Sequence, residues 1–184
     1  MDKINDDVSL DRDVSSGEFR QAMRRLVGGV SLVTVGQGHE ITGMTITSIA
    51  SLSAEPPSLV VIVNRSASSW PLLKRNQFFG VSILHPGQVE LAERFAGRRG
   101  VAGADRFADG EWITRVSGTP LLATALAAFD CEIEDIVERH SHAIVIGRPI
   151  DLMLSQSTAA LGYWQGQYLA VDRAEDEIEL LRVP

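Results

Sequence analysis

The chain contains a single cysteine, Cys131, among its 184 residues, so it cannot form an internal disulfide. This excludes the disulfide scaffolds of small secreted proteins and fits the reducing cytoplasm, which is the location we expect. Cys131 lies in an alternating apolar pattern with Phe129 and Ile133. Because buried thiols are usually inert, we interpret Cys131 as a small core residue rather than a reactive group.

Long hydrophobic runs are also missing. No apolar run reaches the ~18 residues that a membrane-spanning helix requires. The N-terminus is acidic and does not resemble a signal peptide. We therefore expect no membrane partner.

Positive charge is scarce, since the chain has 17 Lys and Arg against 24 Asp and Glu and a net charge of −7. Arg94, Arg98 and Arg99 come closest to a basic cluster, but Glu90 and Glu93 lie beside them. Nucleic-acid binding depends on clustered Lys and Arg. We therefore expect no nucleic-acid partner.

Several familiar motifs are absent. The chain has no Gly-x-Gly-x-x-Gly after a strand, no Gly-x-x-x-x-Gly-Lys loop and no Gly-x-Ser-x-Gly elbow. His140 and His142 could present two imidazoles on one strand face, which would suggest a metal. Without a nearby cysteine or a third histidine this makes a weak site, so we predict no metal.

The composition is that of one globular domain with acidic ends. We expect residues 1–14 to be a disordered lead-in, residues 15–172 to form the domain, and residues 173–184 to be an acidic tail, for which a surface helix is one interpretation.

A helix is expected directly after the lead-in. Ser15-x-x-Glu18 is a capping-box pattern that predicts a helix start. The helical spacing of four apolar residues predicts a buried face on this helix. These residues are Phe19, Met23, Leu26 and Val27.

Strand patterns dominate the rest of the chain. Strands are expected at residues 30–35, 40–42, 58–64, 78–84, 125–137 and 143–153. The run at 58–64 reads as fully buried, helices are expected after Ser69 and over residues 88–96, and 97–118 is expected to be a long mobile excursion. Regular β-α-β alternation is absent, which favours a mainly β fold, a β-barrel with peripheral helices.

Two polar segments flank the predicted strand at 58–64. Six of the twelve residues at 42–53 carry hydroxyl groups, and a polar loop follows at 64–69. One interpretation is a phosphate-bearing ligand, with hydroxyl donors and Arg65 as the counter-charge. The other is that these hydroxyls satisfy turns and strand ends, as Ser and Thr often do. Because two such segments flank one strand, we favour a bound ligand.

The motifs resemble those of the short-chain flavin reductases, the reductase components of two-component flavin monooxygenases. The most specific block is Gly43-Met44-Thr45-x-x-Ser48-x-x-Ser51-Leu52-Ser53-x-x-Pro56-Pro57. Further pieces follow in the family's order: Asn64-Arg65-x-Ala67-x-Ser69, Phe79-Gly80-Val81-Ser82-Ile83-Leu84, His142-x-Ile144-x-Ile146-Gly147 and Tyr163-x-x-Gly166-x-Tyr168. The resemblance covers residues 17–172.

This resemblance implies an FMN-binding split β-barrel that forms a homodimer. It also implies an NAD(P)H:flavin oxidoreductase that reduces FMN or FAD with NADH or NADPH and supplies reduced flavin to a separate monooxygenase component. The residues implied to line the flavin are Thr45, Ile46, Thr47, Ser48, Ser51, Leu52 and Ser53. Those implied at its phosphate end are Asn64, Arg65 and Ser69, with Phe79, Gly80 and Val81 approaching by main chain. His142 falls where the family places a histidine near the nicotinamide.

Two positions depart from the family's pattern. Family members commonly carry Gly-Asp before the histidine, whereas Ser141 precedes His142, and Thr47 stands where Asn or an apolar residue is frequent. An alternative function is therefore a non-catalytic flavin carrier or sensor on the same barrel. A third is a barrel for another ligand, such as pyridoxal phosphate or haem. The choices between FMN and FAD and between NADH and NADPH stay open.

Overall fold

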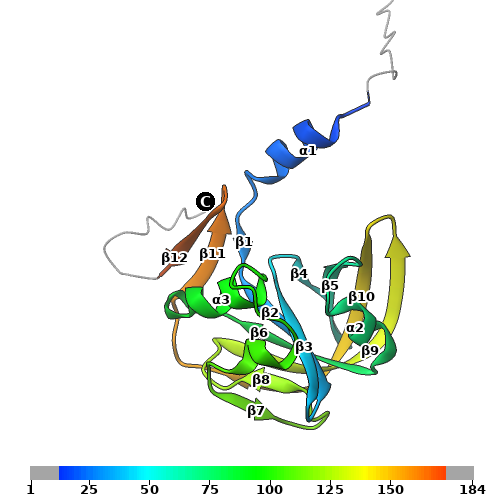
Figure 1. Cartoon of the computed structure of the whole chain (residues 1–184), viewed down its shortest axis with the longest axis vertical. Coiled ribbons are helices and arrows are strands. Elements are labelled where there is room, and N and C mark those ends of the chain that lie inside the picture. The colour runs from blue at the N-terminus through cyan, green and yellow to red at the C-terminus, as the bar shows by residue number, and fades with distance from the viewer. Residues whose placement is uncertain (1–12, 173–184) are drawn as a thin grey trace, which may run out of the picture.

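The structure is a computed structural model that describes residues 13–172. Its ribbon is a curled antiparallel sheet with short helices at its periphery (Figure 1). The strands are β1 (Gly28–Gly29), β2 (Ser31–Gln37), β3 (Glu40–Ile46), β4 (Ile49–Ala54), β5 (Pro57–Asn64), β6 (Phe78–Ile83), β7 (Trp112–Thr114), β8 (Pro120–Leu122), β9 (Ala127–Arg139), β10 (His142–Leu154), β11 (Ala160–Trp164) and β12 (Gln167–Val171). The helices are α1 (Ser16–Met23), α2 (Trp70–Arg75) and α3 (Val89–Phe95), with 3-10 turns η1 (Pro86–Gln88) and η2 (Gly103–Phe107).

Seven strands form the main sheet, in the order β3-β2-β6-β9-β10-β5-β4. Its two edge strands, β3 and β4, are joined by only Thr47 and Ser48. Because a two-residue connection cannot span an open sheet of this width, the sheet must curl until its edges meet there. The predicted mainly β architecture with peripheral helices is confirmed, and the curled sheet places the 45–48 segment at the seam between its edges.

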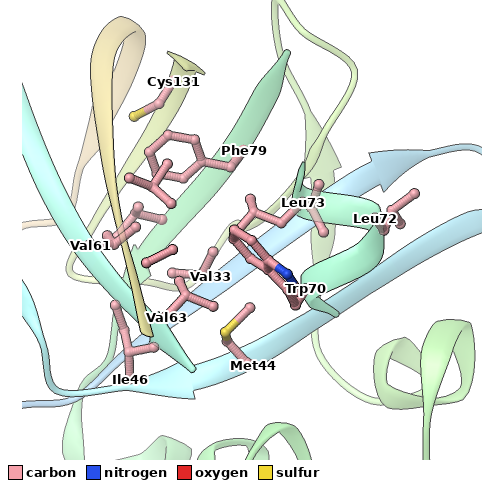
Figure 2. Close-up of a cluster of buried hydrophobic side chains, with 14 of the residues drawn as sticks. Val33, Met44, Ile46, Val61, Val63, Trp70, Leu72, Leu73, Phe79 and Cys131 are labelled. Carbon is pink, nitrogen blue, oxygen red and sulfur yellow. The ribbon is translucent and has the colours of Figure 1, made fainter. Parts of the chain in front are cut away.

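The concave side of this sheet holds one of two clusters of buried apolar side chains. Figure 2 shows Phe79 in this cluster beside Val61 and Cys131. Cys131 is fully buried, and this burial, followed by the charge of Asp130, raises the pKa of its thiol to about 12. The thiol is therefore protonated at neutral pH, which confirms the interpretation of Cys131 as a core residue.

The predicted helix start at Ser15 is confirmed, because the Ser15 and Glu18 side chains form a reciprocal capping box. The prediction that this helix buries an apolar face is wrong in the structure of the single chain. Helix α1 buries no residue, and Phe19 and Met23 are 58% and 48% exposed. Figure 1 shows the reason: α1 projects away from the sheet instead of packing on it.

Two further expectations are corrected. Strand β5 alternates between buried and exposed residues, because one face of an antiparallel strand covers the core and the other faces outward. Residues 97–118 are not a structureless excursion. They contain η2 and β7, and Phe107 and Trp112 pack on Phe95 with ring centroids 5.0 and 5.5 Å from its own.

The predicted lead-in and acidic tail fall mostly on residues 1–12 and 173–184, which lie outside the described residues. Within residues 13–172, the structure contains no helix that is long and apolar enough to span a membrane.

Candidate functional site

A cavity of about 470 Å³ opens at the seam between the edges of the sheet. It lies between the end of β3, the start of α2, the end of α3 and the adjoining ends of β5 and β10. Seven of the residues predicted from sequence line it: Thr45, Ile46, Thr47, Ser48, Asn64, Ser69 and His142. Seven others complete the wall: Met44, Ile62, Ala67, Ser68, Phe95, Ala96 and Arg106. The volume is in the range of small-molecule and cofactor sites.

Two hydroxyls of the predicted segment already donate to protein groups. Thr45 Oγ1 donates to Ala92 O at 2.6 Å, and Ser48 Oγ donates to Ile62 O at 2.8 Å. These bonds tie the end of β3 to α3 and the start of β4 to β5. The hydroxyls of these two residues therefore satisfy main-chain groups, which is the second of the two interpretations drawn from the sequence. Each hydroxyl has used its one donor and can only accept a hydrogen bond from a ligand.

Ser69 is different, because it lines the cavity and its buried hydroxyl has no protein partner. Its side chain is fully buried at the start of α2, and it makes no capping hydrogen bond. Among residues 13–172, Ser69 Oγ is the one buried side-chain oxygen or nitrogen without a hydrogen-bond partner. An unsatisfied buried hydroxyl costs about 1–3 kcal/mol. A polar ligand in the cavity would remove that cost.

The positive charge at the cavity comes from Arg106, which was not predicted from sequence. Its side chain is 7% exposed and is held by the carbonyl oxygens of Gly43 and Val101, with Ser68 Oγ 3.4 Å from Nη2. Burial lowers the pKa of its guanidinium. No carboxylate within residues 13–172 forms an ion pair with it. A buried cation held by carbonyl groups at a cavity wall is suited to bind an anion.

Arg65, the predicted counter-charge, faces elsewhere. It forms an ion pair with Glu138 at 2.6 Å and donates to His140 O at 2.9 Å. Glu138 also pairs with Lys74 at 2.6 Å, and these contacts lower the pKa of the Glu138 carboxyl, the Lys74 hydrogen bond most. Arg65 therefore stabilises the turn between β9 and β10 and does not line the cavity.

Six other predicted residues also lie outside this cavity. Ser51, Leu52 and Ser53 are on the edge strand β4, where Leu52 is 55% exposed. Phe79, Gly80 and Val81 are buried on β6, which pairs with β2 on one side and β9 on the other. At Gly80 and Val81 both edges of β6 are paired with neighbouring strands, so the main chain of these residues is engaged in the sheet. The structure assigns these three residues to the core.

His142 begins β10, opposite Asn64 of β5, and lines the rim of the cavity. Its Nδ1 lies 2.8 Å from Ser141 Oγ, so the residue that departs from the family's pattern contacts the imidazole directly. His140 lies in the preceding turn with a φ of 50°, outside the strand. The two histidines therefore do not share a strand face. Within the described part of the chain, no three His, Cys, Asp or Glu side chains gather to hold a metal ion.

Comparison with known proteins identifies the family. Residues 23–172 match the family described as "Flavin reductase like domain". The chain belongs to the flavin reductase-like family. Among curated members, "FMN reductase (NADH) RutF 2" of Methylorubrum extorquens is 37% identical over 164 residues, which cover 89% of this chain and 94% of that protein.

Solved structures of the family share this fold. BorF, the flavin reductase component of a bacterial two-component tryptophan halogenase, superposes with a TM-score of 0.78 at 30% identity, covering 86% of this chain and 99% of BorF. The Streptomyces globisporus NADH:FAD oxidoreductase SgcE6, solved with NAD and FAD fragments, gives a TM-score of 0.78 at 28% identity, covering 87% of this chain and 94% of its own. The predicted split-barrel fold is confirmed.

Proposed function

We propose that this chain is an NADH-dependent flavin reductase whose flavin lies in the cavity at residues 44–48, with its phosphate at Arg106 and Ser69. The observation that carries this proposal is the pairing, in one cavity wall, of a buried guanidinium without a carboxylate partner and a buried hydroxyl without any partner. Family membership supplies the reaction class, and relatives such as RutF 2 and SgcE6 are named for NADH and FMN or FAD.

The cavity residues fit a flavin nucleotide. Ser69 Oγ and the Arg106 guanidinium would hold the phosphate, which accepts hydrogen bonds from both. Apolar side chains, Met44, Ile46, Ile62 and Phe95, line the rest of the cavity and suit a flat ring system. The short connection at Thr47 and Ser48 would place its backbone along the edge of the ring.

The main role of the protein in this reaction is to position the nicotinamide and flavin rings. A hydride passes from reduced nicotinamide to oxidised flavin, which also takes up a proton from solvent, leaving NAD⁺ and reduced flavin. Holding the two rings in contact supplies much of the rate. His142 at the cavity rim, with Ser141 fixing its ring, would orient the nicotinamide. No acid–base group is required at the reacting atoms.

Reduced flavin would then pass to a separate flavin-dependent enzyme. BorF, which serves a halogenase, is an example of such a reductase component. We therefore include a separate oxygenase or halogenase among the partners, with a monooxygenase as the expectation from sequence.

The test is steady-state oxidation of the reduced nicotinamide by the purified chain. We expect NADH consumption that depends on added flavin, with FMN at least as good as FAD and NADH preferred over NADPH. Four assays, one for each pair of flavin and nicotinamide, measure this. Stoichiometric flavin binding without nicotinamide oxidation would instead establish the flavin carrier or sensor.

The homodimer is a separate proposal, supported by exposed apolar side chains on α1 and in the turn that follows it. Phe19, Met23, Leu26 and Val27 are between 48% and 65% exposed. An eight-residue helix is marginal in water without tertiary contacts, so a second copy of the chain would cover these side chains. We expect sedimentation to give twice the 20.0 kDa chain mass, and a Phe19→Glu variant to shift toward the monomer. A wild-type monomer at micromolar concentration would contradict this proposal.

A further inference from the structure

A second cavity adjoins the proposed flavin cavity. It has a volume of about 190 Å³ and shares Thr45, Ile46, Thr47 and Ala96 with the larger cavity. Its remaining wall comes from Val30, Arg98, Tyr163 and Tyr168. The two cavities therefore lie against the same end of β3, with the 45–47 segment common to both walls. The second is too small for a flavin and has room for one smaller ring system.

Two tyrosines form the aromatic wall of this second cavity. Tyr163 of β11 and Tyr168 of β12 are directly paired across the strands, with ring centroids 5.1 Å apart and planes at 64°. Both are half-buried, so ring surface remains accessible. Aromatic side chains of this kind stack on nucleotide bases without requiring a particular base, and each stacked base contributes about 1–3 kcal/mol.

Hydrogen bonds hold the tyrosines and an arginine together at the mouth of the cavity. Arg98 donates to the Tyr163 hydroxyl at 3.2 Å and pairs with Glu93 at 2.6 Å. Tyr168 is hydrogen-bonded to Glu93, and burial first, then this bond, raise the pKa of its phenol to about 12. The Arg98 side chain is nonetheless 51% exposed. The N–H groups of Arg98 that do not bond to Glu93 or Tyr163 are therefore open to a phosphate oxygen, and the Glu93 carboxylate beside them offsets part of the positive charge.

We propose that this second cavity binds the adenosine phosphate part of a dinucleotide, with the adenine against Tyr163 and Tyr168 and a phosphate at Arg98. This rests on the proposed function, because the ring that reacts must lie in the adjoining flavin cavity. NADH and FAD both carry an adenosine diphosphate group and could each place it here. The adenosine phosphate of NADH is the source that we test first, since FMN has none.

The first test measures binding without turnover. AMP is titrated calorimetrically into the chain saturated with FMN, so that the flavin cavity is filled. We expect saturable AMP binding that Tyr163→Leu and Arg98→Gln each weaken about tenfold, as loss of one stacked base or one charge-assisted contact implies. Leucine retains apolar volume at a partly buried position, and circular dichroism confirms that each variant folds.

Arg99→Gln is the matched control. Arg99 is also 51% exposed and also paired with a glutamate, Glu90, but it does not line the cavity. We expect this variant to bind AMP as the wild type does. Absence of AMP binding to the wild type at millimolar concentration, as when a second copy of the chain covers the cavity, would overturn the proposal. Equal losses in the Arg98 and Arg99 variants would also overturn it.

Kinetics then separate the two sources. With FMN, Tyr163→Leu is expected to raise the KM for NADH about tenfold and to leave unchanged the KM for reduced nicotinamide mononucleotide, which lacks adenosine. A rise confined to the KM for FAD would assign the cavity to FAD instead. Equal rises for the substrates with and without adenosine would overturn the proposal. If the chain binds AMP as predicted but oxidises no NADH, the proposed reductase function is wrong and the assignment of this cavity to an adenosine phosphate stands.

Discussion

Replacing Arg106 with methionine is expected to weaken FMN binding about a hundredfold. The guanidinium is the buried positive charge at the cavity, and a charge-assisted contact of this kind contributes up to about 3 kcal/mol. Methionine retains much of the side-chain length and apolar volume while removing the charge. Flavin fluorescence quenching measures the dissociation constant directly.

Riboflavin supplies the internal control for Arg106→Met, since it has the flavin ring but no phosphate. We expect its affinity to change by less than about threefold. Arg65→Met is the matched variant, because Arg65 pairs with Glu138 away from the cavity and should leave FMN affinity unchanged. Equal losses for FMN and riboflavin would show that Arg106 supports the cavity walls and does not bind phosphate.

Replacing Gly80 with alanine is expected to destabilise the fold by about 2–3 kcal/mol and to leave FMN affinity unchanged. An added Cβ would lie 2.6 Å from Leu121 Cδ2 and closer still to Thr34 Oγ1. Thr34 cannot turn away freely, because its hydroxyl donates to Pro120 O at 2.5 Å. In a chain of this length the loss corresponds to a Tm lower by about 8 °C, which calorimetry measures.

Gly29→Ala is the control for this strand substitution, since no heavy atom lies within 4 Å of its added Cβ. Its Tm should stay within about 2 °C of the wild type. The comparison also separates two roles for residues 79–81. If their main chain contacted flavin, as the sequence resemblance implies, Gly80→Ala would weaken FMN binding as well as lower the Tm.

Local patterns predicted much of this fold. The capping box at Ser15 and the helix after Ser69 depend on neighbouring residues, and both are present. The alternation around Cys131 also correctly predicted a strand, but its expected solvent-facing side is covered there, since Asp130 is fully buried and hydrogen-bonded to Ser117. These features were accessible because the residues that determine them lie within a few positions of one another in sequence.

The position of the positive charge at the cavity, that of Arg106, could not be predicted from local sequence patterns. Arg106 reaches the cavity only because Phe107 and Trp112 pack on Phe95 and hold the 97–118 segment against the sheet. Contacts over such sequence separations leave no local periodicity. The signal that could have indicated them is the pair of large aromatic residues in a segment otherwise rich in Gly and charge, since such side chains usually anchor a loop to a core.

The tertiary structure gives the predicted hydroxyl groups different roles. Thr45 and Ser48 donate to main-chain carbonyls, whereas Ser69 is left without a partner. Sequence cannot distinguish these cases, because whether a hydroxyl is satisfied depends on which carbonyl the fold brings near it.

Mixing the chain with NADH and FMN in the absence of oxygen tests the central claim most directly. The visible absorbance of oxidised FMN should disappear, one FMN for each NADH consumed, at a rate proportional to protein concentration, and Arg106→Met should lower that rate at subsaturating FMN. FMN that keeps its oxidised spectrum in the presence of NADH and protein would contradict the assignment of this cavity to flavin reduction.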